Sequence, residues 1–145
     1  MSWDVYLEDR TKKPVCDYGI SPEKFKPVYD YHKPCDVPCY PVVSVKKHNE
    51  GGTYAIGGTD SADLNITYNY SQDFRKVIGY KESFSEWLTG KKAKDIISVL
   101  ENAVNTLGVE RSEDYWASDS GNAGYALNIL LGWARQYPEA IFRVS

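Results

Sequence analysis

Hydrophobic and polar residues alternate over short segments in the first half of the chain and recur at helical spacing in the second half. The alternation predicts β-strands at residues 3–7, 40–46, 53–56 and 64–68, with connections short enough for antiparallel pairing. The helical spacing predicts helices in the remaining sequence. The sequence therefore predicts an α+β fold, in which a small and mostly antiparallel sheet of three or four strands is covered on one face by about three helices.

The expected helices are bounded by residues that favour helix starts and stops. The first covers residues 71–89, with Gly79 as an interruption inside it. The second covers residues 93–107, where apolar residues recur at intervals of three and four. The third runs from about residue 122 to residue 136, and its apolar residues cover more than half of its circumference. We expect this last helix to be the most buried.

Residues 14–41 differ in character from the rest of the chain. They contain six of the seven prolines and all three cysteines. Proline at this density excludes long helices and central strands. We therefore expect one domain spanning residues 1–145, with residues 14–41 as an irregular Pro/Cys-rich insertion. An irregular loop of this length is unusual in a compact domain unless something holds it in place.

A structural zinc ion is one way to hold the insertion. Cys16, His32, Cys35 and Cys39 offer three thiols and one imidazole, which are ligands that zinc prefers in a tetrahedral site. Four protein ligands leave no open position for a substrate, so the ion would be structural. Alternatively, the cysteines pack as small apolar residues, because their spacing matches no common zinc motif.

Composition narrows the classes of function. The net charge is −3 and the basic residues are scattered, which argues against a general nucleic-acid-binding protein. No apolar run approaches the roughly 20 residues of a membrane span. The first residues lack the basic and apolar regions of a signal peptide, so we expect a cytoplasmic protein. Self-association stays open.

Polar residues in the segment 64–70 are the most informative feature of the sequence. Strand alternation would place Asn65, Thr67 and Asn69 together on the face opposite the apolar residues. Asparagine is normally depleted in strands, so two in one short strand require a reason. The row of amides could bind a small polar ligand, or it could only hold neighbouring backbone in place.

Aromatic residues with polar tips complete this candidate site. The chain has twelve tyrosines and four tryptophans, residue types that favour interfaces and ligand pockets, although tyrosine also lines the rim of small cores. The amides at the start of the last helix favour an anion such as phosphate, unless the residues before it merely cap the helix. The ligand-binding residues predicted for a nucleotide-like molecule are Asn65, Thr67, Tyr68, Asn69, Tyr115, Trp116 and Asn122.

Catalytic motifs are weaker. The chain contains no nucleophile elbow, phosphate-binding loop or His-Glu-x-x-His motif. Asp60, Asp63 and Asp73 flank the polar strand, and Glu113 and Asp114 precede two aromatic residues. Any two of these carboxylates could meet in a cleft and perform acid–base chemistry. The alternative is that they serve solvation, helix capping and the helix dipole.

Several segments resemble a family of small phage and prophage proteins that has no established activity. They are Gly-Gly-Thr-Tyr, Leu-Asn-Ile-Thr-Tyr-Asn-Tyr-Ser, Leu-Thr-Gly-Lys, Asp-Tyr-Trp-Ala and Gly-Asn-Ala-Gly. Members of the family carry an Asn-Ile-Thr-(Tyr/His)-Asn segment at the corresponding strand. The resemblance covers the first strand and residues 50–140, whereas residues 14–41 depart from it, so the proposed metal is not implied for the family.

Three hypotheses follow from the residues and the resemblance together. The first is a non-enzymatic phage accessory protein that binds a small nucleotide-like ligand or a host protein, to counter a bacterial defence system. The second is a small hydrolase or transferase acting on a nucleotide-like substrate, which would need an ionisable group with a shifted pKa. The third is an inhibitor that binds a protein through exposed aromatic side chains.

Overall fold

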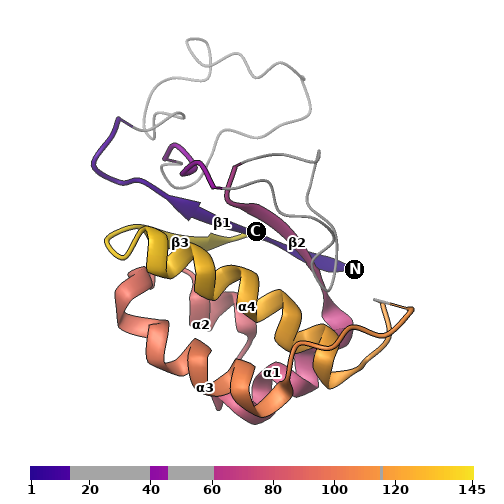
Figure 1. The fold of residues 1–145 in the computed structure, drawn as a ribbon. Coiled ribbons are helices and arrows are strands. Elements are labelled where there is room, and N and C mark those ends of the chain that lie inside the picture. The colour runs from indigo at the N-terminus through magenta and orange to yellow at the C-terminus, as the bar shows by residue number, and fades with distance from the viewer. Residues whose placement is uncertain (14–39, 46–60, 115) are drawn as a thin grey trace, which may run out of the picture.

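The chain folds into one antiparallel sheet with helices packed on a single face. The computed structural model describes residues 1–13, 40–45, 61–114 and 116–145. Three strands, β1 (Ser2–Glu8), β2 (Asp63–Thr67) and β3 (Ile141–Val144), pair in the order β2-β1-β3. The helices of the described residues lie on the same side of this sheet (Figure 1). The predicted α+β class, with its small antiparallel sheet, is therefore confirmed.

Two of the four predicted strands form within the described residues. β1 and β2 match the expected segments 3–7 and 64–68, with β2 ending at residue 67. Residues 40–45 form only isolated bridges, between Glu8 and Val42 and between Ser44 and Ser61, so a full strand there was wrongly predicted. The expected strand 53–56 lies outside the described residues.

β3 was not predicted, although its sequence carries a signal. Ile-Phe-Arg-Val follows the helix-breaking Pro138 and is rich in β-branched and aromatic residues. Tyr6 lies opposite Arg143, and Leu7 opposite Phe142. The first predicted strand is thus the centre of the sheet, and it pairs with the end of the chain.

The segment after β2 turns away from the sheet instead of continuing it. Tyr68–Tyr70 forms a single turn of 3-10 helix, called η2, and the Thr67 hydroxyl accepts a hydrogen bond from the Asn69 amide at 3.3 Å. Thr67 acts as the helix cap, a role that threonine favours. Alternation therefore stops at Thr67, and Tyr68 and Asn69 are placed on the surface.

The predicted helices form close to their expected positions. The first is split at Gly79, whose φ of 83° suits glycine, into α1 (Ser71–Ile78) and α2 (Phe84–Leu88). The second comprises the 3-10 turn η3 (Ala93–Ile96) and α3 (Ile97–Leu107). The third is α4 (Ser120–Gln136), which has ten buried residues and is, as predicted, the most buried helix described.

Aromatic rings form a large part of the core between the sheet and the helices. The Trp3 ring lies 4.7 Å from the Tyr68 ring and 5.0 Å from the Phe84 ring, measured between centroids. Tyr80 and Trp87 continue this packing on the far side of Phe84. We call the set the aromatic cluster; its members are Trp3, Tyr68, Phe74, Tyr80, Phe84 and Trp87. The cluster extends from Tyr68, after the end of β2, to Tyr80 and Trp87 beside and within α2.

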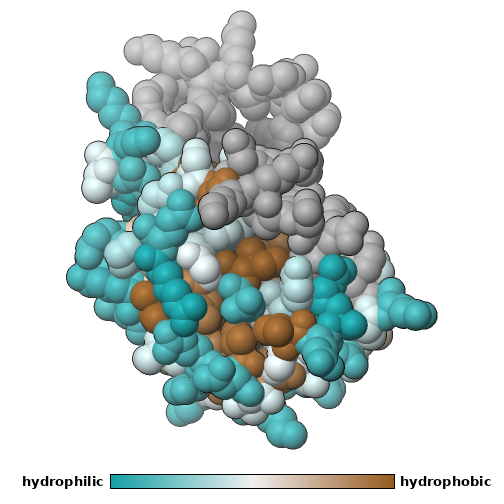
Figure 2. Space-filling view, viewed as in Figure 1, coloured by the Kyte–Doolittle hydropathy of each residue, from teal (hydrophilic) through white to brown (hydrophobic). Residues whose placement is uncertain are grey.

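The connection between α3 and α4 lies directly on the backbone of α4. A Cβ atom added at Gly124 would lie 1.8 Å from the carbonyl oxygen of Gly108, and one added at Gly121 would lie 1.8 Å from that of Glu110. Only glycine permits such an approach. Figure 2, in the orientation of Figure 1, shows apolar side chains gathered where α3 and α4 meet, with hydrophilic side chains around them. The glycines therefore fix the course of residues 108–110 and with it the loop that follows.

Within the described ranges, none of the helices has the length and apolar character needed to cross a membrane.

Candidate functional site

The structure brings two predicted site segments together. The Asn69 side-chain amide donates a hydrogen bond of 2.6 Å to the carbonyl oxygen of Trp116, 47 residues further along the chain. Tyr68 is 39% exposed and Trp116 is 38% exposed, although most large hydrophobic side chains are buried. We call Tyr68, Asn69 and Trp116 the aromatic corner. It lies where the loop before α4 passes the end of β2 (Figure 1).

Asn122 shapes the loop that carries Trp116. Its side chain is fully buried, and its Oδ1 accepts a hydrogen bond of 3.0 Å from the Ser112 amide. Its Nδ2 lies within 3.2 Å of the Ser112 hydroxyl and of the carbonyl oxygens of Asp114 and Ala117. These contacts use the donors and the acceptor of the amide. Asn122 thus holds the loop in shape, and no part of its side chain is left for a ligand in this arrangement.

The start of α4 carries its own negative charge. Oδ1 of Asp119 accepts hydrogen bonds from the amides of Gly121, at 2.9 Å, and Asn122, at 3.3 Å. A carboxylate therefore occupies the position where a phosphate would interact with the helix amides. From the sequence, the residues before α4 could either cap the helix or leave its amides open to an anion. The structure shows the helix cap.

The remaining predicted residues lie apart from the aromatic corner or outside the described part. Asn65 is 8% exposed and donates to the Ser2 hydroxyl, at 2.7 Å, and to the Asp4 carboxylate, at 2.8 Å. Thr67 is buried and caps η2. The predicted row of polar side chains is therefore divided, because the turn at η2 directs Asn69 away from the sheet. Tyr115 lies outside the described residues.

A second polar group of side chains lies on the sheet face opposite the helices. Trp3, Val5 and Leu7 of β1 are buried toward the helices, so Asp4, Tyr6 and Glu8 face the other way. The register places Asn65 across from Asp4. It places Asp63 of β2 and Arg143 of β3 across from Tyr6. The Arg143 guanidinium lies 4.2 Å from the centre of the Tyr6 ring.

Asp63 is the carboxylate whose pKa is most clearly altered in this group. Burial, followed by the nearby negative charge of Asp4, raises the pKa of Asp63 to about 6, and Arg143 partly opposes this rise. Its Oδ1 atom is buried and has no hydrogen-bond partner in the described structure. Asp63 is thus a carboxylate whose protonation changes near neutral pH.

Replacing Asp63 with asparagine is expected to stabilise the protein near neutral pH. Because the pKa of Asp63 in the folded state is raised to about 6, ionisation of this carboxyl group destabilises the fold as the pH rises. Asp63→Asn should add about 1 kcal/mol to the free energy of unfolding at about pH 7.5, a value discounted because the side chain is partly exposed. The gain should shrink as the pH falls toward about 4, where the wild-type carboxyl is protonated when folded. Urea unfolding at several pH values measures this gain in stability. Asp95→Asn, at an exposed position, is the control. The same gain for Asp63→Asn at every pH would contradict the prediction.

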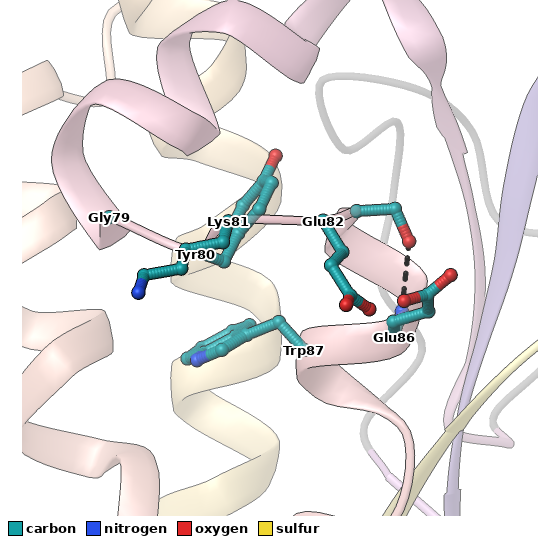
Figure 3. Close-up of a pocket in the computed structure, with 7 residues that line it drawn as sticks. Gly79, Tyr80, Lys81, Glu82, Glu86 and Trp87 are labelled. Atoms are coloured by element: carbon teal, nitrogen blue, oxygen red, sulfur yellow. Dashed lines mark hydrogen bonds between the residues drawn. The ribbon is translucent and has the colours of Figure 1, made fainter.

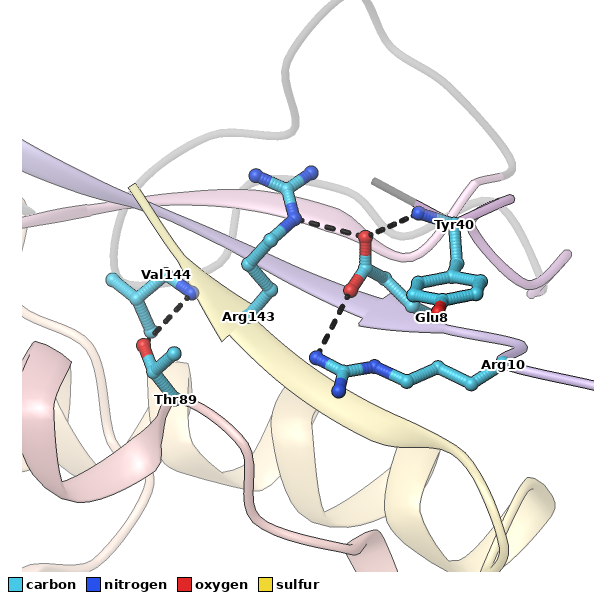
Figure 4. A network of polar contacts seen from close by, with 6 residues as sticks. All are labelled: Glu8, Arg10, Tyr40, Thr89, Arg143 and Val144. Atoms are coloured by element: carbon cyan, nitrogen blue, oxygen red, sulfur yellow. Dashed lines mark hydrogen bonds and ion pairs between the residues drawn. The ribbon is translucent and has the colours of Figure 1, made fainter. Parts of the chain in front are cut away.

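Glu8 is a buried charge that the sequence did not reveal. It is fully buried at the end of β1, where its Oε2 accepts hydrogen bonds from the backbone amide of Tyr40, at 3.0 Å, and from Nε of Arg143, at 2.9 Å (Figure 4). Arg10 lies 3.6 Å from its Oε1. Glu8 begins a run of charged residues that reads as a solvated strand exit. Nothing in that run distinguishes it, because the two groups that hydrogen-bond to its carboxylate, from Tyr40 and Arg143, come from distant segments.

The other candidate carboxylates take structural or surface positions. The Asp114 carboxylate accepts a hydrogen bond of 3.0 Å from the Trp116 amide and so supports the aromatic corner. Glu113 is exposed in the same loop, and Asp73 lies in the first turn of α1, where its charge suits the helix dipole. Asp60 lies outside the described residues.

The predicted zinc ligands Cys16, His32, Cys35 and Cys39 also lie outside the described residues. Within residues 1–13, 40–45, 61–114 and 116–145, no group of three or more His, Cys, Asp or Glu side chains is arranged to hold a metal ion.

Three surface hollows lined by described residues lie away from the aromatic corner. One of about 310 Å³ lies between α1 and α2, beside Tyr80 and Trp87. One of about 250 Å³ lies beside Tyr137, and one of about 470 Å³ lies at the start of α4, beside Glu110 and Asp119. Neither Tyr68 nor Trp116 lines one of these three hollows, and both side chains are exposed, so the aromatic corner is a surface feature.

Comparison of the chain with protein-family models, with curated proteins and with solved structures finds no match.

Proposed function

We propose that the protein is a non-enzymatic binding protein that contacts a partner protein through the aromatic corner. The observation that carries the proposal is the exposed Trp116, held beside the Tyr68–Asn69 turn by the Asn69 amide and by the loop that Asn122 fixes. Tryptophan and tyrosine are enriched among the residues that dominate binding energies at protein interfaces. A loop fixed before binding loses less entropy when the partner docks.

A protein partner fits this surface better than a small nucleotide-like ligand. The amides of Asn65 and Asn122, expected to contact such a ligand, are engaged inside the protein. The start of α4 is occupied by the Asp119 carboxylate, which would repel a phosphate. What remains exposed is aromatic area with polar groups at its edge, as at the centre of a protein interface.

The resemblance to phage and prophage proteins suggests the kind of partner. Under this proposal the protein acts in the cytoplasm of a bacterial cell, and the partner is a host protein, such as a component of a defence system. Binding through a small aromatic surface would be enough to block such a component without any chemical step. The absence of a membrane-crossing helix among the described residues is compatible with this role.

Removing either exposed ring should weaken capture of the partner. Wild-type protein immobilised at fixed density is expected to retain a host protein from bacterial lysate, identified by mass spectrometry and then purified for affinity measurement. Trp116→Ala and Tyr68→Ala should each weaken the interaction by about 2 kcal/mol or more, which is about 30-fold in dissociation constant. The physical reason is the loss of aromatic area from the centre of the contact surface.

Val109→Ala provides the matched control, because Val109 is a similarly exposed apolar side chain, at 41%, outside the aromatic corner. It should leave the affinity unchanged. Equal affinities for wild type, Trp116→Ala and Tyr68→Ala would refute the proposal. A thermal shift with a nucleotide, lost in Trp116→Ala in the absence of any protein partner, would instead support the small-ligand alternative.

One observation favours an enzymatic alternative. The raised pKa of Asp63, about 6, suits a general acid or base near neutral pH, and Asp4 and Tyr6 lie on the same sheet face. Such an enzyme would act on a nucleotide-like substrate as a hydrolase or transferase. Turnover of a nucleotide panel by the wild type, abolished in the stable Asp63→Asn protein, would establish this alternative over a pure binding role.

A further inference from the structure

The hollow between α1 and α2 combines aromatic walls with a carboxylate rim. Its volume is about 310 Å³, and Figure 3 shows the residues that line it. The lining residues are Gly79, Tyr80, Lys81, Glu82, Ser83, Glu86 and Trp87. Most of them belong to the short connection between the two helices, and the last two belong to the first turns of α2. The hollow is thus built from one continuous segment and does not involve the aromatic corner.

Positively charged side chains already lie beside the rings of the hollow, since Lys81 lines it and Arg75 lies near Tyr80. The rings of Tyr80 and Trp87 stack with centroids 6.4 Å apart and planes 28° apart. The Arg75 guanidinium lies 5.5 Å from the centre of the Tyr80 ring and donates hydrogen bonds to the carbonyl oxygens of Lys81 and Glu82. Cations are attracted to the faces of such rings. Part of this surface is therefore electrostatically suited to a cation.

The other side of the hollow carries two carboxylates. Glu82 and Glu86 lie near one another on one side of the hollow (Figure 3). In the part of the chain that the structure describes, no lysine or arginine forms an ion pair with either group. A side-chain hydrogen bond with Glu82, and then its negative charge, raise the pKa of Glu86. Two like charges near one another are less favourable than separated ones, and a cation between them would relieve the repulsion.

Backbone contacts fix the segment that carries the two glutamates. The Ser83 hydroxyl caps α2 by accepting a hydrogen bond of 3.1 Å from the Glu86 amide. The Arg75 contacts fix the preceding connection, and the buried Phe84 and Leu88 anchor α2 in the core. The backbone positions from which Glu82 and Glu86 extend are therefore fixed relative to one another.

We propose that this hollow binds a single organic cation, an alkylammonium or guanidinium group, between the glutamate pair and the Trp87 ring. The carboxylates supply charge-assisted hydrogen-bond acceptors, and the ring supplies a face for the apolar stem and the charge. An anion would be repelled, and a neutral ligand would leave the like charges unrelieved. The cation can come from a free polyamine or from a lysine or arginine side chain of a partner protein, since both present the same chemistry.

The direct test is an NMR titration that follows the indole N–H signal of Trp87, assigned with a Trp87→Phe variant. The probes are n-butylammonium and methylguanidinium chloride, with n-butanol and sodium chloride as the neutral and ionic-strength controls. We expect saturable shifts of the Trp87 signal at millimolar concentrations of the two cations only. Equal responses to n-butanol, or to sodium chloride alone, would overturn the proposal.

Glutamine substitutions test the role of the glutamate pair. Glu82→Gln and Glu86→Gln should each weaken cation binding about 5-fold, the effect of losing one charge-assisted contact at an exposed position. Glu113→Gln is the matched control, because it removes the same charge from an exposed position in another loop, and binding should stay within about 2-fold of wild type. The same weakening in all three variants would show a general charge effect and no site.

The pH dependence and the source of the cation follow from the same titration. Because binding favours the ionised pair, the affinity for n-butylammonium should increase as the pH rises through the elevated pKa of Glu86. Spermidine and a short lysine-containing peptide then distinguish the two sources, since the natural source should bind more tightly than n-butylammonium. An affinity independent of pH would refute the involvement of Glu86. This site is independent of the aromatic corner, so either proposal can fail without the other.

Discussion

Gly124→Ala is expected to destabilise the protein by about 3 kcal/mol or more, as severe overpacking does, or to prevent folding. The new Cβ atom would lie 1.8 Å from the Gly108 carbonyl oxygen, which belongs to the backbone and cannot rotate away as a side chain can. Either α4 or the segment that leaves α3 would have to move. Because that segment leads into the Trp116 loop, partner binding should be lost as well.

Gly132→Ala in the same helix is the matched control. Nothing lies within 4 Å of a Cβ atom added at Gly132, so this substitution should stabilise the protein by about 0.5–1 kcal/mol through helix propensity alone. Urea denaturation followed by circular dichroism compares the two variants. Similar stabilities for Gly124→Ala and Gly132→Ala would show that the Gly108 carbonyl does not lie this close to α4.

Glu8→Ala is the second substitution expected to have a large effect, at about 3–5 kcal/mol, the cost of removing one partner from a buried ion pair. Glu8 is fully buried, and the Arg143 side chain is only 20% exposed. The substitution would remove the carboxylate that accepts hydrogen bonds from Arg143 and from the Tyr40 amide, and it would leave a cavity in its place. It would therefore weaken the junction between β1, β3 and residues 40–45.

Glu139→Ala provides the comparison, because Glu139 forms ion pairs with Lys92 and Lys94 on the surface, with 66% of its side chain exposed. Exposed pairs of this kind contribute little, so its unfolding midpoint should stay near that of the wild type. Thermal and urea unfolding of both variants measure the difference. A Glu8→Ala protein as stable as Glu139→Ala would mean that the buried network does not contribute to the fold.

Much of the fold could be predicted from the sequence because local patterns determine it. The alternation at β1 and β2, the helical spacing at α3 and α4, and the stop at Gly79 each depend on neighbouring residues. The failures have non-local causes. Residues 40–45 have strand composition, but they meet β1 and residue 61 only through isolated bridges. β3 is too short for its pattern to stand out until its pairing with β1 is known.

The candidate site was predictable only in part. The sequence indicated Tyr68, Asn69 and Trp116, and the structure places Asn69 against the Trp116 backbone. It could not show that Asn122 is turned inward, since an asparagine at a helix start is equally compatible with a surface role. The cation-binding hollow was not recognised, because Glu82 and Glu86 resemble ordinary solvent-facing residues until the rings beside them are located.

The pairing of β1 with β3 has a consequence for how the chain acquires its structure during synthesis. β1 can complete its pairing on both sides only after residues 141–145 have emerged from the ribosome, since Asp4 and Ser145 exchange backbone hydrogen bonds. Such a long-range closure is entropically costly and slow. Until then, one border of the nascent sheet offers unsatisfied amides and carbonyls to other chains. Production of the protein should therefore be sensitive to translation rate and to chaperone supply.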